Sequence, residues 1–185
     1  LLSLNAMAGE FQLSRTTLDR YSGLLKQLFL IDTLPPWFTN ATKQLTKTPK
    51  LHLVDSGLAA MLSKVELPIL AKGLKYYGQL VESFVYGELK KMMTWEGIDD
   101  SLFHYRSSRK HEVDVVLEGP GRTFVGIEVK ASMTISRDDF KGLMALREDM
   151  GGGRFKAGIV LYEGEHALSF GHGLVALPIP ALWKL

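Results

Sequence analysis

The chain has 185 residues, 46% of them hydrophobic, which is enough for one large domain or two small ones. It has no cysteine, which excludes disulfide bonds, thiolate metal sites and a cysteine nucleophile and fits a cytoplasmic location. Its 22 Lys and Arg residues nearly balance 20 Asp and Glu residues, so the formal charge of +2 does not by itself indicate nucleic-acid binding. No apolar run is long enough to span a membrane, and there is no signal-peptide pattern.

The sequence opens at Leu1 in mid-pattern, so we expect it to be the C-terminal part of a longer protein. Pro68 and Gly73 interrupt the periodic patterns of the chain. We therefore predict two regions, residues 1–66 and residues 67–185.

The first region, residues 1–66, reads as a small helical unit with a hairpin. Ser14 is a plausible N-cap, and apolar residues recur at helical spacing after it. An apolar run ends at Leu34 before two prolines, residues 51–54 resemble a returning strand, and Asp55 caps a short helix. The order helix, helix, hairpin predicts a winged-helix segment.

A winged helix places its second helix in the major groove of DNA and its wing on the phosphates. A winged helix that only packs against another domain would show the same pattern, so both interpretations stay open. The residues expected to contact DNA are Arg15, Thr16, Thr17 and Arg20 on the helix and Lys43, Lys47 and Lys50 in the wing.

The second region, residues 67–185, alternates helices and strands. A helix is expected over residues 76–94, a strand over 102–106, and a hairpin of 111–118 and 123–130 that turns at Gly119 and Gly121. A helix over 137–149, strands over 156–162 and 174–177, and a short C-terminal helix follow. This order predicts an α/β (α+β) fold in which a mixed sheet is flanked by helices.

The hairpin carries the pattern that points to chemistry. Pairing centred on Gly121 places Asp114 opposite Glu128, and Glu112 opposite Lys130. One face is then wholly apolar, and the other gathers these four charged residues; the apolar face would consist of Val113, Val115, Leu117, Val125, Ile127 and Val129. Facing carboxylates repel each other, and a divalent cation between them reverses the sign.

An ordinary hairpin with one solvated face would show the same alternation, and a slip of one residue would exchange the faces. The preceding helix adds acidic candidates, because Glu82 lies on the flank of its apolar stripe and Glu88 lies nearer the middle. Either residue could reach the hairpin. The stripe itself is expected to consist of Val81, Phe84, Val85, Leu89 and Met92.

Asp114 followed by Glu128-Val129-Lys130 resembles the signature of PD-(D/E)xK nucleases, and Glu82 matches the acidic residue that many of them carry on the preceding helix. Val113 stands where the signature has proline, a departure that many members share. The resemblance implies a restriction-endonuclease-like core. It further implies a metal held by Asp114, Glu128 and the Val129 carbonyl, a catalytic Lys130, and Glu82 completing the site.

A broader resemblance covers nearly the whole chain. The segments are residues 17–21, 50–58, 78–89, 105–106, 112–114 and 127–130. They are similar to the C-terminal region of bacterial and archaeal AAA+-like P-loop ATPases, catalogued as domain of unknown function 4143. This resemblance implies a winged-helix segment and a nuclease-like domain that follow an ATPase module.

No G-x-x-x-x-G-K-[ST] sequence is present, so we expect no nucleotide site here and an ATPase partner in the preceding part of the protein. The leading hypothesis is a Mg²⁺-dependent (or Mn²⁺-dependent) DNA phosphodiesterase. The alternative is an inactive module that binds DNA or a partner protein. Self-association is a third possibility.

Overall fold

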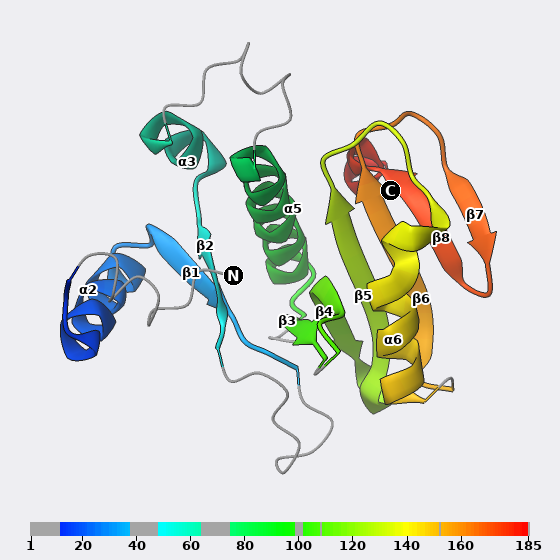
Figure 1. The fold of residues 1–185 in the computed structure, drawn as a ribbon, viewed down its shortest axis with the longest axis horizontal. Coiled ribbons are helices and arrows are strands. Elements are labelled where there is room, and N and C mark those ends of the chain that lie inside the picture. The colour runs from blue at the N-terminus through cyan, green and yellow to red at the C-terminus, as the bar shows by residue number, and fades with distance from the viewer. Residues whose placement is uncertain are drawn as a thin grey trace.

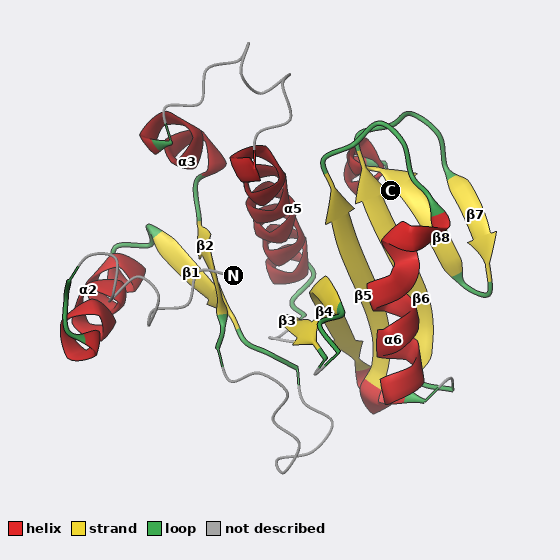
Figure 2. Ribbon diagram, viewed as in Figure 1, coloured by secondary structure: helices red, strands yellow, loops and turns green. Residues whose placement is uncertain are grey.

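The computed structural model describes residues 12–37, 48–63, 75–98, 102–107, 109–151 and 153–184. They form an α+β fold with a mixed sheet flanked by helices, as predicted (Figures 1 and 2). The boundary predicted between residues 66 and 67 lies outside the described residues. Within the described ranges, no helix is long and apolar enough to cross a membrane.

Four elements form what we call the N-terminal unit. They are α2 (Arg15–Gln27), β1 (Ile31–Leu34), β2 (Lys50–Leu53) and α3 (Ser56–Leu62). Both predicted caps are confirmed, because Ser14 Oγ accepts from Thr17 N at 3.1 Å and Asp55 Oδ1 accepts from Leu58 N at 2.8 Å. β1 and β2 pair antiparallel as a two-stranded sheet, so the helix and hairpin expected from the sequence are present.

The second region is built on a six-stranded sheet. Its strand order is β3-β4-β5-β6-β8-β7; β5, β6 and β8 are mutually parallel, and the other neighbours are antiparallel. The strands are β3 (Leu102–Arg106), β4 (Glu112–Gly119), β5 (Thr123–Lys130), β6 (Phe155–Tyr162), β7 (Leu168–Gly171) and β8 (Leu174–Pro178). β7 was not predicted from the sequence.

Helices cover both faces of this sheet (Figure 2). α5 (Lys75–Trp95) packs one face through Val85 and Leu89. α6 (Lys141–Met150), which continues a 3₁₀ turn over residues 137–140, packs the other face through Leu143 and Leu146. Further 3₁₀ turns occupy residues 120–122 and 179–183. The sheet therefore separates two hydrophobic cores.

The buried stripe of α5 differs from the prediction at two of its positions, because Met92 is only partly buried and Phe84 is exposed. Phe84 rests against Trp183, whereas Tyr86 is buried. Tyr86 stacks on His52 of β2 at a centroid distance of 4.4 Å and donates to Asp32 of β1 at 2.8 Å. α5 thus contacts the sheet on one side and the N-terminal unit on another, which turns its buried stripe away from Phe84.

Candidate functional site

The hairpin of β4 and β5 has the predicted register from Val115 to Gly119, but the pairs predicted for Asp114 with Glu128 and for Glu112 with Lys130 lie beyond this regular pairing. Val115 pairs with Ile127, Leu117 with Val125, and Gly119 with Thr123. The regular pairing ends at Val115. Beyond it, the side chain of Asp114 bonds β5, because its Oδ2 accepts from the backbone N–H of Val129 at 2.9 Å. Asp114 is therefore fixed beside the Glu128-Val129-Lys130 segment by a charge-assisted hydrogen bond.

A bulge in β4 changes which way the side chains near Asp114 point. Phe103 of β3 pairs with Val116 and Tyr105 with Val113, so two residues of β4 oppose the single residue His104. Val113 consequently joins the core under α6, whereas Val115 joins the core under α5. The prediction that Val113 shares the apolar face of Val115 and Leu117 is wrong, because regular alternation does not survive the bulge.

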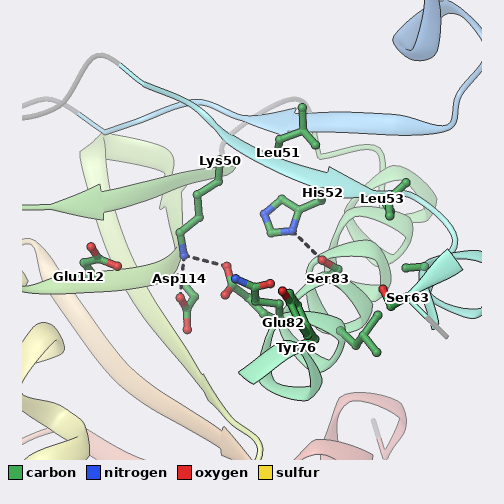
Figure 3. A pocket seen from close by; sticks show the side chains of 13 residues that line it. Lys50, Leu51, His52, Leu53, Ser63, Tyr76, Glu82, Ser83, Glu112 and Asp114 are labelled. Carbon is green, nitrogen blue, oxygen red and sulfur yellow. Dashed lines mark hydrogen bonds and ion pairs between the residues drawn. The ribbon is translucent and has the colours of Figure 1, made fainter. Parts of the chain in front are cut away.

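Lys50 of β2 reaches into this region from the N-terminal unit. Its Nζ lies 2.7 Å from Asp114 Oδ1 and 2.7 Å from Glu82 Oε1 of α5 (Figure 3). Lys50 is only 7% exposed. Its predicted role, touching DNA phosphates from the wing, is therefore wrong in this arrangement, because the ammonium group is buried and holds two carboxylates.

Glu128 and Lys130 lie two residues apart on the same face of β5. Lys130 Nζ donates to Glu128 Oε1 at 3.0 Å, and Glu128 Oε2 is buried without a hydrogen-bond partner among the described residues. We call Glu82, Asp114 and Glu128, together with Lys50 and Lys130, the carboxylate site. Three of its members come from the hairpin, one from α5 and one from the N-terminal unit.

The electrostatics of the carboxylate site favour neutral acids. Burial, and then the charge of Asp114, raise the pKa of Glu128 to about 8, against the opposing effect of Lys130. Burial and Asp114 also raise the pKa of Glu82. Burial lowers the pKa of Lys50, but Asp114 and Glu82 outweigh it, so the net pKa is raised and this ammonium stays charged. The two glutamates therefore hold a proton more readily than a free carboxyl group does, whereas Lys50 keeps its charge.

The residues present fit a divalent cation of the Mg²⁺ type. No three His, Asp or Glu side chains among the described residues are grouped as a complete metal-ligand cluster. Mg²⁺, however, is usually held by one or two carboxylates, with water and substrate phosphate filling the other positions. Asp114 and Glu128 supply two carboxylates, and Glu128 Oε2 is a buried acceptor that lacks a donor among the described residues. The Val129 carbonyl, which follows Glu128 in the sequence, is the third oxygen that the nuclease signature implies for such an ion.

A cavity of about 310 Å³ opens beside Lys50, Glu82 and Asp114 and is lined by β2, α3, α5 and β4 (Figure 3). His52 forms part of its wall; its Nδ1 lies 3.1 Å from Ser83 Oγ. Burial, and then the charge of Lys50, lower the pKa of His52 to about 4, so its imidazole is neutral near pH 7. No sequence motif marks His52 as part of a site.

Two other acidic candidates are paired elsewhere. Glu112, predicted to share the charged face, lies 3.0 Å from Arg106 Nε at the edge of the cavity. Glu88 lies 2.5 Å from Lys91 and accepts from Trp183 Nε1 at 3.3 Å. Of the two glutamates predicted on α5, only Glu82 reaches the hairpin.

The predicted DNA-contacting residues of α2 do not join this site. Arg15, Thr16 and Arg20 are exposed, and Arg15 Nε lies 3.7 Å from Asp19. Thr17 is partly buried beside the Ser14 cap. α2 packs on β1 and contributes no residue to the cavity. Lys43 and Lys47 lie outside the described residues.

Comparison with known proteins gives two family matches. Residues 77–182 match the family described as Domain of unknown function (DUF4143), and residues 1–68 match the one described as Domain of unknown function (DUF8612). Two curated proteins are each 27% identical over 180 residues: Uncharacterized protein Rv2008c of Mycobacterium tuberculosis and Uncharacterized protein Mb2031c of Mycobacterium bovis. These similarities cover 96% of the chain and 38% of each relative. No solved structure gives a significant match.

Proposed function

We propose a function for this chain from the premise that it belongs to the family described as Domain of unknown function (DUF4143), which it matches over residues 77–182. The proposed function is that of a divalent-metal-dependent phosphodiesterase that acts on DNA. The observation that carries it is the convergence of Asp114 and Glu128 with Lys130 at the bulged end of the hairpin.

The order of the elements supports the same proposal. A helix (α5), three antiparallel strands (β3, β4 and β5), a second helix (α6) and a parallel strand (β6) follow one another around the carboxylate site. We assign this arrangement to the restriction-endonuclease-like core that the sequence signature implies. Fold alone does not establish activity, so the side chains of the carboxylate site carry the proposal.

In this proposal, Asp114 and Glu128 hold Mg²⁺ or Mn²⁺ together with the Val129 carbonyl. The bound ion supplies Lewis-acid polarisation of the phosphate and lowers the pKa of an attacking water. Lys130, one-third exposed at its side chain and 3.0 Å from Glu128, stabilises the negative charge that develops on the phosphate. Glu82, across the site on α5, completes the site by orienting a water molecule.

Cleavage of DNA by the purified chain tests this assignment. We expect Mg²⁺-dependent or Mn²⁺-dependent cleavage that Asp114→Ala and Lys130→Ala reduce by at least about 100-fold, the scale on which one electrostatic group contributes to catalysis. Lys141→Ala is the matched control, because Lys141 is an exposed lysine that pairs with Asp138 at 3.0 Å. Equal cleavage by wild type and both site variants would refute the assignment.

A second function is favoured by one observation, the pairing of Lys50 with Asp114 and Glu82. A site that already carries its own cation suits a module that binds DNA or a partner protein without cleaving it. In that case α2 and the β1–β2 hairpin act as a winged helix, with Arg15 and Arg20 of α2 on DNA. Salt-dependent DNA binding without cleavage in Mg²⁺ or Mn²⁺ would support this function over the first.

An ATPase partner, which the family resemblance implies, is compatible with both functions. The chain spans about two fifths of the curated relatives that it matches, which leaves room in those proteins for further domains. We propose that an AAA+-like P-loop module of the same protein is the partner, and that the protein acts in the cytoplasm. Copurification of the chain with the separately expressed preceding region would test this partnership.

A further inference from the structure

The carboxylate site contains a cation that belongs to the other half of the molecule. Lys50 lies on β2, a strand that pairs with β1 in the N-terminal unit and is separated from the six-stranded sheet. Its ammonium nevertheless makes 2.7 Å contacts with Asp114 of β4 and Glu82 of α5 (Figure 3). The side chain is 8% exposed, so this ion pair is shielded from water and salt.

Both oxygens of Asp114 are engaged in this state. Oδ1 accepts from Lys50 at 2.7 Å, and Oδ2 accepts from the Val129 backbone N–H at 2.9 Å. A divalent ion that binds Asp114 through Oδ1 therefore competes with the Lys50 ammonium for the same atom. The backbone N–H of Val129 is fixed within β5, whereas the lysine side chain has rotatable bonds, so Lys50 is the partner that can yield.

The net charge of the site also favours a metal ion that replaces Lys50 over one that binds beside it. Three carboxylates and two ammonium groups leave the fully ionised site with one negative charge. A divalent ion added beside Lys50 would reverse that sign in a buried place, whereas the same ion in place of Lys50 would leave the site neutral. Burying uncompensated charge is costly, so exchange is favoured over addition.

From these contacts we propose that Lys50 is a tethered competitor of the divalent cation, and that the metal binds only when the ammonium leaves Asp114 and Glu82. This inference rests on the proposed metal-dependent function. It makes the N-terminal unit the regulator of the site, because a displacement of β2 removes the competitor. Metal loading and the position of the N-terminal unit are then thermodynamically linked, each favouring the other.

Mn²⁺ titration calorimetry on the whole chain tests the proposal, with wild type, Lys50→Met and Asp114→Asn compared under one buffer. If the Lys50 ammonium is away from Asp114 in about one tenth of the molecules, a variant without the ammonium binds the ion about tenfold more tightly. We expect Lys50→Met to bind Mn²⁺ at least that much more tightly and Asp114→Asn to lose binding. Lys26→Met is the control, because Lys26 is another lysine of the N-terminal unit and donates to Thr33 Oγ1 at 2.8 Å.

A second measurement separates displacement from simple charge repulsion and does not depend on how Lys50→Met folds. The ¹³Cε signal of Lys50 in wild type, assigned with Lys50→Arg, is followed during a Mg²⁺ titration. Displacement moves this signal to the value of a solvent-exposed lysine. A Lys50 signal that is unchanged at saturating Mg²⁺ would overturn the proposal.

The calorimetric outcomes keep the two proposals apart. Equal Mn²⁺ affinity of wild type and Lys50→Met, with binding lost in Asp114→Asn, would overturn the competitor role and leave the metal site standing. The absence of Mn²⁺ binding in wild type and in a folded Lys50→Met, judged by circular dichroism, would overturn both.

Discussion

Glu128 is expected to make the metal-free protein less stable as the pH rises. Its pKa is raised from 4.5 to about 8, first by burial and then by the charge of Asp114. The folded state therefore holds this proton more tightly than the unfolded state does between these two values. Stability that is fully present below about pH 4.5 is lost progressively as the pH rises through about 8.

The size of the effect follows from the shift. Each pKa unit corresponds to about 1.4 kcal/mol, so the rise from 4.5 to about 8 gives a loss on the order of 5 kcal/mol by about pH 9. Lys130 opposes the shift but does not cancel it, because one third of its side chain is exposed. Gln at position 128 has the same shape and no charge, and its amide oxygen can still accept from Lys130.

Urea unfolding of wild type and Glu128→Gln between about pH 5 and 9, in the presence of EDTA, measures this loss. The variant should become the more stable protein at alkaline pH, with the difference in unfolding free energy growing from about pH 5 upward. His52 and His104 act in the opposite sense. Their pKa values are lowered to about 4, first by burial, so they reduce stability only in acid. Parallel pH profiles of wild type and variant would refute the buried, protonated state of Glu128.

Three further predictions follow from the same structure. Gly142→Ala should cost about 3 kcal/mol in urea unfolding, because a Cβ at this position would lie 1.9 Å from the Glu112 carbonyl oxygen; an unchanged midpoint would contradict the packing of α6 on β4. Asp55→Ala should cost about 1 kcal/mol by loss of the 2.8 Å cap to Leu58 N, and equal thermal stability would contradict the cap. Because Glu128 must lose its proton to bind metal, Mn²⁺ affinity should rise between about pH 6 and 8 with proton release, measured calorimetrically in buffers of different ionisation enthalpy. A pH-independent affinity would exclude Glu128 as a ligand.

Local signals in the sequence were sufficient for most of the fold. The caps at Ser14 and Asp55 and the register of the β4–β5 hairpin each depend on residues close together in the chain. β7 was missed because it has only four residues and lies at the edge of the sheet, where little burial pattern is imposed. Short edge strands are specified by their neighbours in space.

The site was predictable only in part, because some of its residues are also positioned by neighbours in space and not by neighbours in the sequence. The signature predicts Asp114, Glu128 and Lys130, and regular alternation would place Asp114 on the face of Val116. The bulge opposite His104 instead turns Asp114 toward α5, and nothing in the pattern of β4 alone marks it. Lys50 was out of reach of any periodicity argument, because 64 positions separate it from Asp114.

The position of Lys50 also bears on how the chain should be divided. Its ion pairs cross between the N-terminal unit and the sheet, and the stacking of His52 on Tyr86 crosses the same boundary. Removal of one partner of a buried ion pair leaves the other charge uncompensated and is strongly destabilising. A fragment restricted to the second region would therefore lose Lys50 and expose Asp114 and Glu82 to each other. The carboxylate site belongs to both regions, and its chemistry has to be measured on the chain that contains them both.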